Sequence, residues 1–183
     1  MHALYRLTVL AVLGLLVTAA YGAPQVGDRA PDFTLPASDG ETYSLADFHG
    51  REAVVIAWFP RAFTSGCTIE CRSLAENGHL LRPFAATYFM ASVDPLEKNM
   101  AFAESEDADF PLLSDEDQSV AEAYGVLNES GGFARRWTFY IDADGIIVAI
   151  DKNVRPATSA QDMAAKLEEL GVPRRDSVAQ RHD

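Results

Sequence analysis

The sequence of 183 residues has only two cysteines, Cys67 and Cys71, and few positively charged side chains. Two cysteines are too few for a disulfide-stapled mini-protein or a four-cysteine zinc site, although they suffice for one redox pair. There are 15 Lys and Arg against 27 Asp and Glu, so the formal net charge is −12. Because contact with phosphates needs clustered Lys and Arg, this balance argues against a nucleic-acid partner and against adhesion to an anionic membrane.

The sequence also lacks an apolar run of the roughly 20 residues that a helix needs to cross a bilayer. A shorter apolar run at residues 7–20 follows Arg6 and precedes small residues. This order is typical of a secretory signal. We expect residues 1–22 to be a signal peptide cleaved after Gly22, which leaves a periplasmic or secreted protein without stable membrane association. An uncleaved membrane anchor is the alternative.

The rest of the sequence has no long linker, internal repeat or low-complexity tract, and its strands alternate with helices. A hydrophobic fraction of 48% is enough to bury a core. We expect a hairpin at 32–45, strands at 53–59, 87–93, 110–113, 136–141 and 146–150, and helices at 67–81, 95–105, 118–124 and 159–170. Asp94 can cap the second of these helices. The pattern predicts an α/β domain with a mixed sheet at 23–173, followed by a disordered polar tail at 174–183.

Residues 58–71 contain the side chains most indicative of chemistry. Cys67 comes just after the loop that leaves the apolar strand, where the next helix begins. A helix N-terminus has unpaired N–H groups and a partial positive charge, so it stabilises a thiolate there. Thr64 can offer a hydroxyl to that thiolate or to a bound oxygen, and Pro60 can shield the sulfur from water. The spacing therefore predicts a reactive cysteine at Cys67.

The pattern Pro60-x-x-x-Thr64-x-x-Cys67 resembles that of the peroxiredoxins. Residues 27–33, 92–94 and 136–142 agree with the same family, and the resemblance covers most of the chain after the predicted signal. The branch that it looks like is the bacterioferritin-comigratory, or Q-type, group. The resemblance implies a thioredoxin fold with an N-terminal β-hairpin extension. It also implies an enzyme, a thiol-dependent peroxidase that reduces hydrogen peroxide or organic hydroperoxides.

The resemblance assigns roles residue by residue. Cys67 matches the peroxidatic cysteine, whose thiolate attacks the peroxide O–O bond and becomes a sulfenic acid. Arg136 matches the arginine that holds the thiolate and polarises the leaving oxygen, and Thr64 and Pro60 match the hydroxyl donor and the shield. Glu70 matches a carboxylate that orients the arginine. No cofactor or metal is implied; the implied partner is a thioredoxin-like dithiol reductant, and we expect a monomer or weak dimer.

The second cysteine departs from the family pattern. In the Q-type proteins that have a resolving cysteine in this helix, it lies five residues after the first, where this chain has Arg72; Cys71 lies four residues after. Cβ atoms at that helical spacing are about 5–6 Å apart, against about 3.5–4.5 Å in a disulfide. The first helical turn must therefore unwind before the two cysteines can join. We expect that it does, and that Cys71 resolves Cys67 in an intramolecular disulfide.

Other functions remain possible for the cysteine pair. It could be a static disulfide, although one between adjacent helical turns closes too small a loop to stabilise much. A Cys-x-x-x-Cys pair also occurs in exported Sco-type copper chaperones, because soft thiolates select Cu(I), but no histidine lies beside the late strands to complete such a site. A thiol–disulfide oxidoreductase normally needs Cys-x-x-Cys. A non-catalytic binding module would leave the matched residues without a purpose.

Several other charged or polar groups have simpler explanations. Arg135, next to Arg136, could be one of a solvated pair. The segment 142–145 resembles the start of a calcium loop but lacks the later ligands, so a hairpin turn is expected. The histidines show no ligand spacing. We expect a solvated face at the acidic cluster of Glu104, Glu106, Asp107 and Asp109.

Overall fold

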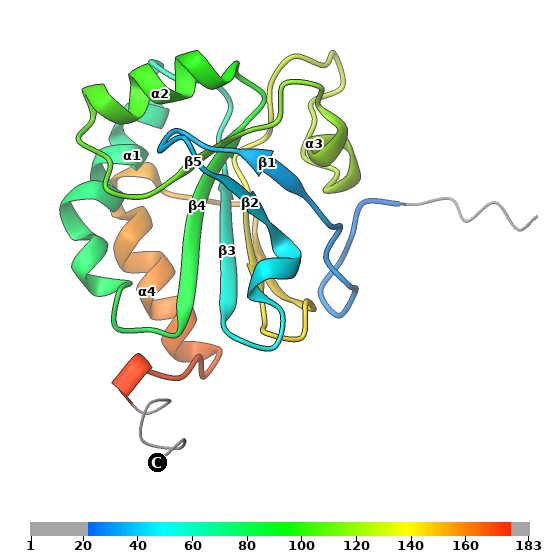
Figure 1. Ribbon diagram of the computed structural model, residues 1–183, viewed down its shortest axis with the longest axis vertical. Coiled ribbons are helices and arrows are strands. Elements are labelled where there is room, and N and C mark those ends of the chain that lie inside the picture. The colour runs from blue at the N-terminus through cyan, green and yellow to red at the C-terminus, as the bar shows by residue number, and fades with distance from the viewer. Residues whose placement is uncertain (1–21, 177–183) are drawn as a thin grey trace, which may run out of the picture.

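The computed structural model describes residues 22–176. Its centre is a five-stranded sheet with the order β5-β4-β3-β6-β7 (Figure 1). β3 (Ala53–Trp58) runs parallel to β4 (Ala86–Ser92), and β4 runs parallel to β5 (Leu112–Ser114). β6 (Thr138–Ile141) is antiparallel to both β3 and β7 (Ile147–Asp151). The predicted mixed sheet is confirmed.

The six residues of β3 are all buried, because the strand lies in the middle of the sheet with both faces covered. Val55 and Ala57 face a core cluster shared with three helices, whereas Val54, Ile56 and Trp58 face a second cluster on the other side. A continuous apolar run is the sequence pattern expected for such a strand. The end of β3 is therefore a rigid base for the loop that follows it.

Helices α1 (Ser65–Asn77), α2 (Leu96–Ser105) and α4 (Ser159–Glu169) contribute to the core on one face of the sheet (Figure 1). The opposite face is covered by α3 (Ser119–Ala123) and by the predicted N-terminal hairpin, whose strands β1 (Thr34–Pro36) and β2 (Thr42–Ser44) pair antiparallel. Short 3₁₀ turns follow β2 (Leu45–Phe48), follow α1 (Gly78–Leu80) and precede α4 (Pro156–Thr158). α1 is therefore shorter than predicted, since it gives way to a tighter turn at Gly78.

The predicted cap of α2 differs from the structure. Asp94 does not cap α2; the N-cap is Pro95, and the Asp94 carboxylate instead accepts hydrogen bonds from the Ala62 backbone N–H at 2.7 Å and from Lys98 at 2.6 Å. A tertiary partner that lies 32 residues away has taken the carboxylate, and local spacing does not reveal such a partner.

The ordered part of the C-terminal segment extends beyond the predicted start of the disordered tail. Arg174, the expected start of a disordered tail, forms a bridge with Phe84, and Arg175 donates to the carbonyl oxygens of Arg82 and Ala86. Arg175 also forms an ion pair with Glu52 at 2.8 Å. Residues 177–183 of the tail and residues 1–21 of the predicted signal lie outside the described residues. Within residues 22–176, no helix is both long and apolar enough to cross a membrane.

Candidate active site

Cys67 lies in the first turn of α1, at the end of the loop that leaves β3. The loop is held at the sheet by the Phe59 N–H, which donates to the Ala91 carbonyl at 2.9 Å, and by the bond from Ala62 to Asp94. Phe63 takes a left-handed conformation with φ of 65°. This geometry turns the chain into α1 and places the Cys67 side chain in the core, with no exposed surface.

Arg136 joins the Cys67 sulfur to a buried carboxylate. Its Nη2 donates to Cys67 Sγ at 3.1 Å, and its Nη1 donates to Glu70 Oε2. The Arg136 side chain is 20% exposed and that of Glu70 is fully buried. Because the guanidinium is planar and carries several donors, one residue can bind the sulfur and the carboxylate together. Arg136 thus provides a fixed positive charge beside the Cys67 sulfur.

Glu70 titrates close to neutral pH. Burial raises its pKa from 4.5 to about 7, and the charge and hydrogen bonds of Arg136 offset part of that rise. The Ser159 hydroxyl, 3.5 Å from Glu70 Oε1, acts in the same direction as Arg136. Burial alone would lower the pKa of Arg136, but the Glu70 carboxylate and the Cys67 thiolate outweigh it and raise that pKa overall. The arginine therefore stays charged while its carboxyl partner changes charge near pH 7.

Thr64 and Pro60 flank this group without contacting the sulfur through a hydrogen bond. Thr64 is the N-cap of α1, but its exposed hydroxyl donates to the Arg61 carbonyl at 2.9 Å rather than to Cys67. Pro60 is half-buried directly after Phe59. The structure brings Cys67, Glu70 and Arg136 together, whereas the Thr64 hydroxyl is bonded to the Arg61 carbonyl and not to the predicted partner.

Gly66 is a site residue that the sequence reasoning missed. A Cβ atom at this position would lie 3.2 Å from Arg136 Nη2, which is tighter than an ordinary van der Waals contact. The absent side chain therefore leaves room for the guanidinium to reach Cys67. A glycine directly before a reactive cysteine, where the predicted helix begins, was the available signal. Ser159 was also missed, since it reaches Glu70 from another helix, 89 residues away.

Cys71 is a free thiol buried one helical turn beyond Cys67, and Cys67 is likewise free. Burial, together with the nearby carboxylates of Glu106 and Glu70, raises the pKa of Cys71 to about 12, and the positive charge of Arg72 offsets part of that rise. At neutral pH the Cys71 sulfur is therefore protonated in this conformation, and it is a poor nucleophile because the thiolate is the reactive form.

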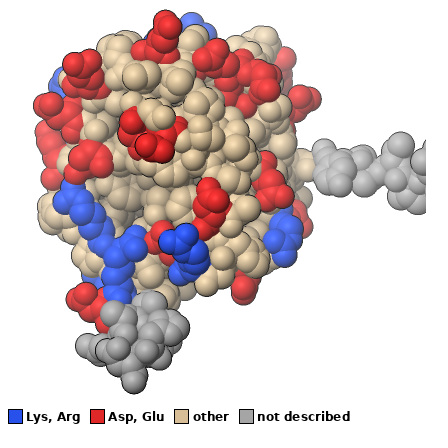
Figure 2. Space-filling model, in the orientation of Figure 1, with Lys and Arg blue, Asp and Glu red and all other residues tan. Residues whose placement is uncertain are grey.

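The acidic cluster is not uniformly solvated, which corrects the sequence-based expectation. The Glu106 side chain is only 6% exposed, and its Oε2 accepts a hydrogen bond from Arg72 Nε at 2.5 Å. Asp109 pairs with Arg82. Elsewhere acidic side chains predominate over the upper part of the face in Figure 2, and basic ones gather at the lower left. The contact with Arg72 thus holds the Glu106 carboxylate beside α1.

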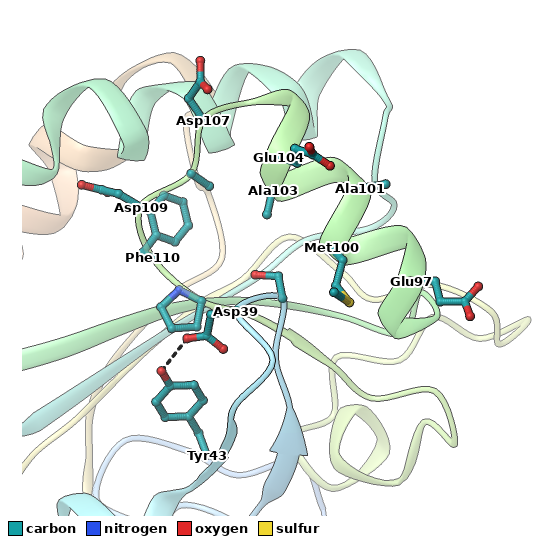
Figure 3. A pocket seen from close by; sticks show the side chains of 13 residues that line it. Asp39, Tyr43, Glu97, Met100, Ala101, Ala103, Glu104, Asp107, Asp109 and Phe110 are labelled. Atoms are coloured by element: carbon teal, nitrogen blue, oxygen red, sulfur yellow. Dashed lines mark hydrogen bonds between the residues drawn. The ribbon is translucent and has the colours of Figure 1, made fainter.

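A cavity of about 990 Å³ lies between α2 and the connection from β1 to β2 (Figure 3). Met100 and Phe110 line it among acidic side chains that include Asp39, whose carboxylate accepts a hydrogen bond from Tyr43 at 2.6 Å. None of Cys67, Thr64 or Arg136 lines this cavity. It is therefore separate from the candidate active site. Over residues 22–176, no group of three or more His, Cys, Asp and Glu side chains is arranged to hold a metal ion.

The chain is similar to known peroxiredoxins in sequence and in structure. Peroxiredoxin Bcp from Escherichia coli is 40% identical over 129 residues, which cover 67% of this chain and 82% of that protein. The crystal structure of peroxidoxin BcpB from Mycobacterium tuberculosis superposes with a TM-score of 0.70 at 31% identity, over 79% of this chain and 96% of that one. PrxQ from Xylella fastidiosa, a cysteine-to-serine mutant, gives a TM-score of 0.74 at 22% identity, over 82% and 99%.

These likenesses confirm the expected thioredoxin fold with its hairpin extension. The copper-chaperone alternative has no support, because the similar proteins are peroxiredoxins and no metal-binding cluster occurs in the described part of the chain. The sequence pattern that defines the AhpC/TSA family matches residues 26–150. The chain therefore belongs to the AhpC/TSA family.

Proposed function

We propose that this protein is a thiol-dependent peroxidase with Cys67 as its nucleophile. The observation that carries the proposal is the Arg136 guanidinium, which lies 3.1 Å from Cys67 Sγ and is bonded to the buried Glu70 carboxylate. A fixed positive charge beside a sulfur favours the thiolate, which is the form that attacks peroxides. The substrate class is hydrogen peroxide or an organic hydroperoxide.

In the first step the Cys67 thiolate attacks the terminal peroxide oxygen. An S–O bond forms, the O–O bond breaks, and the departing oxygen takes up a proton and leaves as water or an alcohol. The sulfur is oxidised to a sulfenic acid and the peroxide is reduced. Negative charge moves from the sulfur to the departing oxygen during this step. Arg136 is placed to stabilise that charge, since preorganised donors act most strongly where charge develops.

In the second step Cys71 resolves the sulfenic acid. The S–S bond forms, the S–O bond of Cys67 breaks, and the hydroxyl leaves with the Cys71 proton as water. Both sulfurs are buried and are separated by one helical turn, so this step includes unwinding at the start of α1. A thioredoxin-like dithiol protein then reduces the disulfide.

The proposal includes export, with residues 1–22 acting as a cleaved signal peptide. Its support is the order of Arg6, an uncharged apolar run and small residues before Ala23. Export places the protein in the periplasm or outside the cell, as a monomer or weak dimer free of the membrane. Because such compartments are oxidising, the dithiol donor must itself be supplied with electrons there.

Peroxide consumption by wild type, Cys67→Ser and Cys71→Ser, with thioredoxin as reductant, tests the mechanism. We expect no turnover by Cys67→Ser. We expect Cys71→Ser to consume about one peroxide per protein and then stop with a sulfenic acid. Mass spectrometry of the oxidised wild type should show the loss of two hydrogens. Wild-type turnover by Cys67→Ser would contradict the peroxidase, and sustained turnover by Cys71→Ser would contradict Cys71 as resolver.

Expression of the full chain in a bacterium tests the export. We expect a periplasmic product that begins at Ala23, as determined by N-terminal sequencing. A product in the cytoplasm that begins at Met1 would contradict the signal peptide.

A further inference from the structure

Cys71 lies between two residues that are each ion-paired with a different part of the fold. Glu70, on one side, is bonded to Arg136 just before β6. Arg72, on the other side, is bonded to Glu106 at the C-cap of α2. Any movement of Cys71 toward Cys67 that turns this part of α1 must strain or break at least one of these pairs.

The turn that precedes these pairs is weakly built. Ser65 and Gly66 are poor helix formers, and the N-cap Thr64 makes no side-chain capping bond. The first turn is joined to the cap by the Thr68 N–H, which donates to the Thr64 carbonyl at 2.9 Å. Fraying of α1 therefore begins at this end, and the first ion pairs that it meets are those at Glu70 and Arg72.

The Arg72–Glu106 pair spans a gap between α1 and the end of α2. A cavity of about 420 Å³ lies there, lined by Arg72, Ala75 and Glu76 from α1 and by Ser105 and Glu106 from the other side. The Glu106 side chain is 6% exposed and its backbone N–H donates to the Phe102 carbonyl, whereas the Arg72 side chain is 60% exposed. Glu106 is thus the fixed partner, and the exposed Arg72 side chain is the one that can move away when the ion pair breaks.

We propose that the Arg72–Glu106 ion pair is a latch that holds Cys71 in its buried position and thereby limits the rate at which it resolves Cys67. The proposal rests on the proposed function. Oxidation of Cys67 to a neutral sulfenic acid removes the thiolate charge that Arg136 binds, so the hold on residue 67 weakens. The Arg72–Glu106 pair is bonded to neither Cys67 nor Arg136, so oxidation of Cys67 removes neither of its partners.

The latch would also set the sensitivity of the enzyme to excess peroxide. While Cys71 is held, the Cys67 sulfenic acid can react with a second peroxide. A second S–O bond then forms, an O–O bond breaks, and the products are a sulfinic acid and water or an alcohol. This oxidation competes with disulfide formation. Faster release of Cys71 therefore lowers the fraction of protein that is lost to sulfinic acid at a given peroxide concentration.

Glu106 could instead act only through its charge, by keeping the Cys71 thiol protonated. The two explanations make opposite predictions for Arg72. If charge alone matters, removing Arg72 slows resolution, because the positive charge that favours the Cys71 thiolate is lost. If the latch matters, removing Arg72 speeds resolution. Arg72→Met keeps much of the aliphatic stem and removes only the charged group, so it separates the two.

The experiment measures the rate of disulfide formation after one equivalent of hydrogen peroxide, by acid quenching and mass spectrometry. Arg72→Met and Glu106→Gln are compared with wild type and with Arg82→Met. This control removes an arginine that is as exposed as Arg72 from its ion pair with Asp109, away from Cys71. We expect both latch variants to form the disulfide about two to five times faster, which is the range for one exposed or half-buried ion pair. We expect sulfinic acid to fall by a similar factor, and Arg82→Met to match wild type.

Hydrogen exchange provides a readout that is independent of peroxide. The backbone amides of residues 68–71 should exchange faster in both latch variants, while those of α4 keep their wild-type rates. An Arg72→Met variant with an unchanged or slower rate of disulfide formation would overturn the latch. Peroxide turnover by wild type without any loss of two hydrogens would overturn the latch but leave the peroxidase standing. Turnover by Cys67→Ser would overturn the peroxidase itself.

Discussion

Arg136 is the residue on which the site geometry depends most directly. Its side chain binds the Cys67 sulfur and the Glu70 carboxylate at the same time. Its neighbour Arg135 has a different environment, with its guanidinium 5.7 Å from the centre of the Trp137 ring and 3.8 Å from Glu129. Two adjacent arginines that look equivalent in the sequence therefore offer a matched pair for mutation.

We expect Arg136→Met to lower kcat/KM for hydrogen peroxide by about 100- to 1,000-fold, as for the loss of one preorganised donor to a developing charge. Arg135→Met serves as the control and should stay within a factor of about three of wild type. Stopped-flow measurement of the first turnover checks both. Equal losses in the two variants would mean that general positive charge, rather than the contact with Cys67, assists the reaction.

The raised pKa of Glu70 predicts a pH dependence of stability. An acid whose pKa rises from 4.5 to about 7 on folding is favoured in its protonated form. That stabilisation is fully present below pH 4.5 and is lost as the pH rises through about 7. From about pH 5 to about pH 8, we expect the free energy of unfolding of wild type to fall by up to about 3 kcal/mol relative to Glu70→Gln. Urea unfolding of both proteins checks this, and parallel curves would contradict it.

At the scale of single elements, the first turn of α1 combines weak helix-forming residues with the reactive cysteine. At Gly66, the residue that would favour the helix conflicts with the position of Arg136 that the reaction needs. Gly66 lies inside the helix, where alanine is the better helix former, yet any Cβ would press on Arg136 Nη2.

We expect Gly66→Ala to lower the rate of the first turnover with peroxide, because the added methyl group pushes Arg136 away from Cys67. The gain in helix propensity, about 0.5–1 kcal/mol, is reduced by the same close contact, so the net stabilisation is smaller than that. Ser65→Ala is the control, since it raises helix propensity beside the same turn without that glycine contact. Thermal unfolding and stopped-flow kinetics measure the two effects. An unchanged rate in Gly66→Ala would show that Arg136 accommodates the methyl group without moving.

Several elements and part of the site were predictable from local pattern. The apolar run of β3, the hairpin of β1 and β2 and the helix start near Cys67 were each predicted, because burial and turn chemistry act over a few residues. The partners of Asp94 and Glu106 were not. Each carboxylate is bound by a group from a distant segment, and such contacts depend on how the elements pack rather than on spacing in the sequence.

For the whole molecule, the excess of acidic side chains bears on how substrates and partners approach. Hydrogen peroxide is neutral, so its encounter with Cys67 is not steered by the net charge of −12. A protein reductant carries its own charge and does respond to this field.

We therefore expect the first-turnover rate with hydrogen peroxide to change by less than about twofold between low and high salt. The rate of reduction by an acidic thioredoxin should rise with salt, because screening weakens the repulsion between two acidic proteins. Stopped-flow measurements of each half-reaction over a salt series distinguish the two. A reduction rate that falls with salt would indicate a local positive patch at the docking site.

The burial of Cys71 makes its reaction with an alkylating agent a measure of how often α1 opens. In Cys67→Ser the only thiol left is completely buried, so an alkylating agent such as iodoacetamide can modify it only when α1 opens. The labelling rate then counts openings of a single helical turn in the resting protein, before any oxidant is present. Labelling rates measured at different temperatures, with ligands or in sequence variants would show how readily the helix opens and exposes Cys71 under each condition.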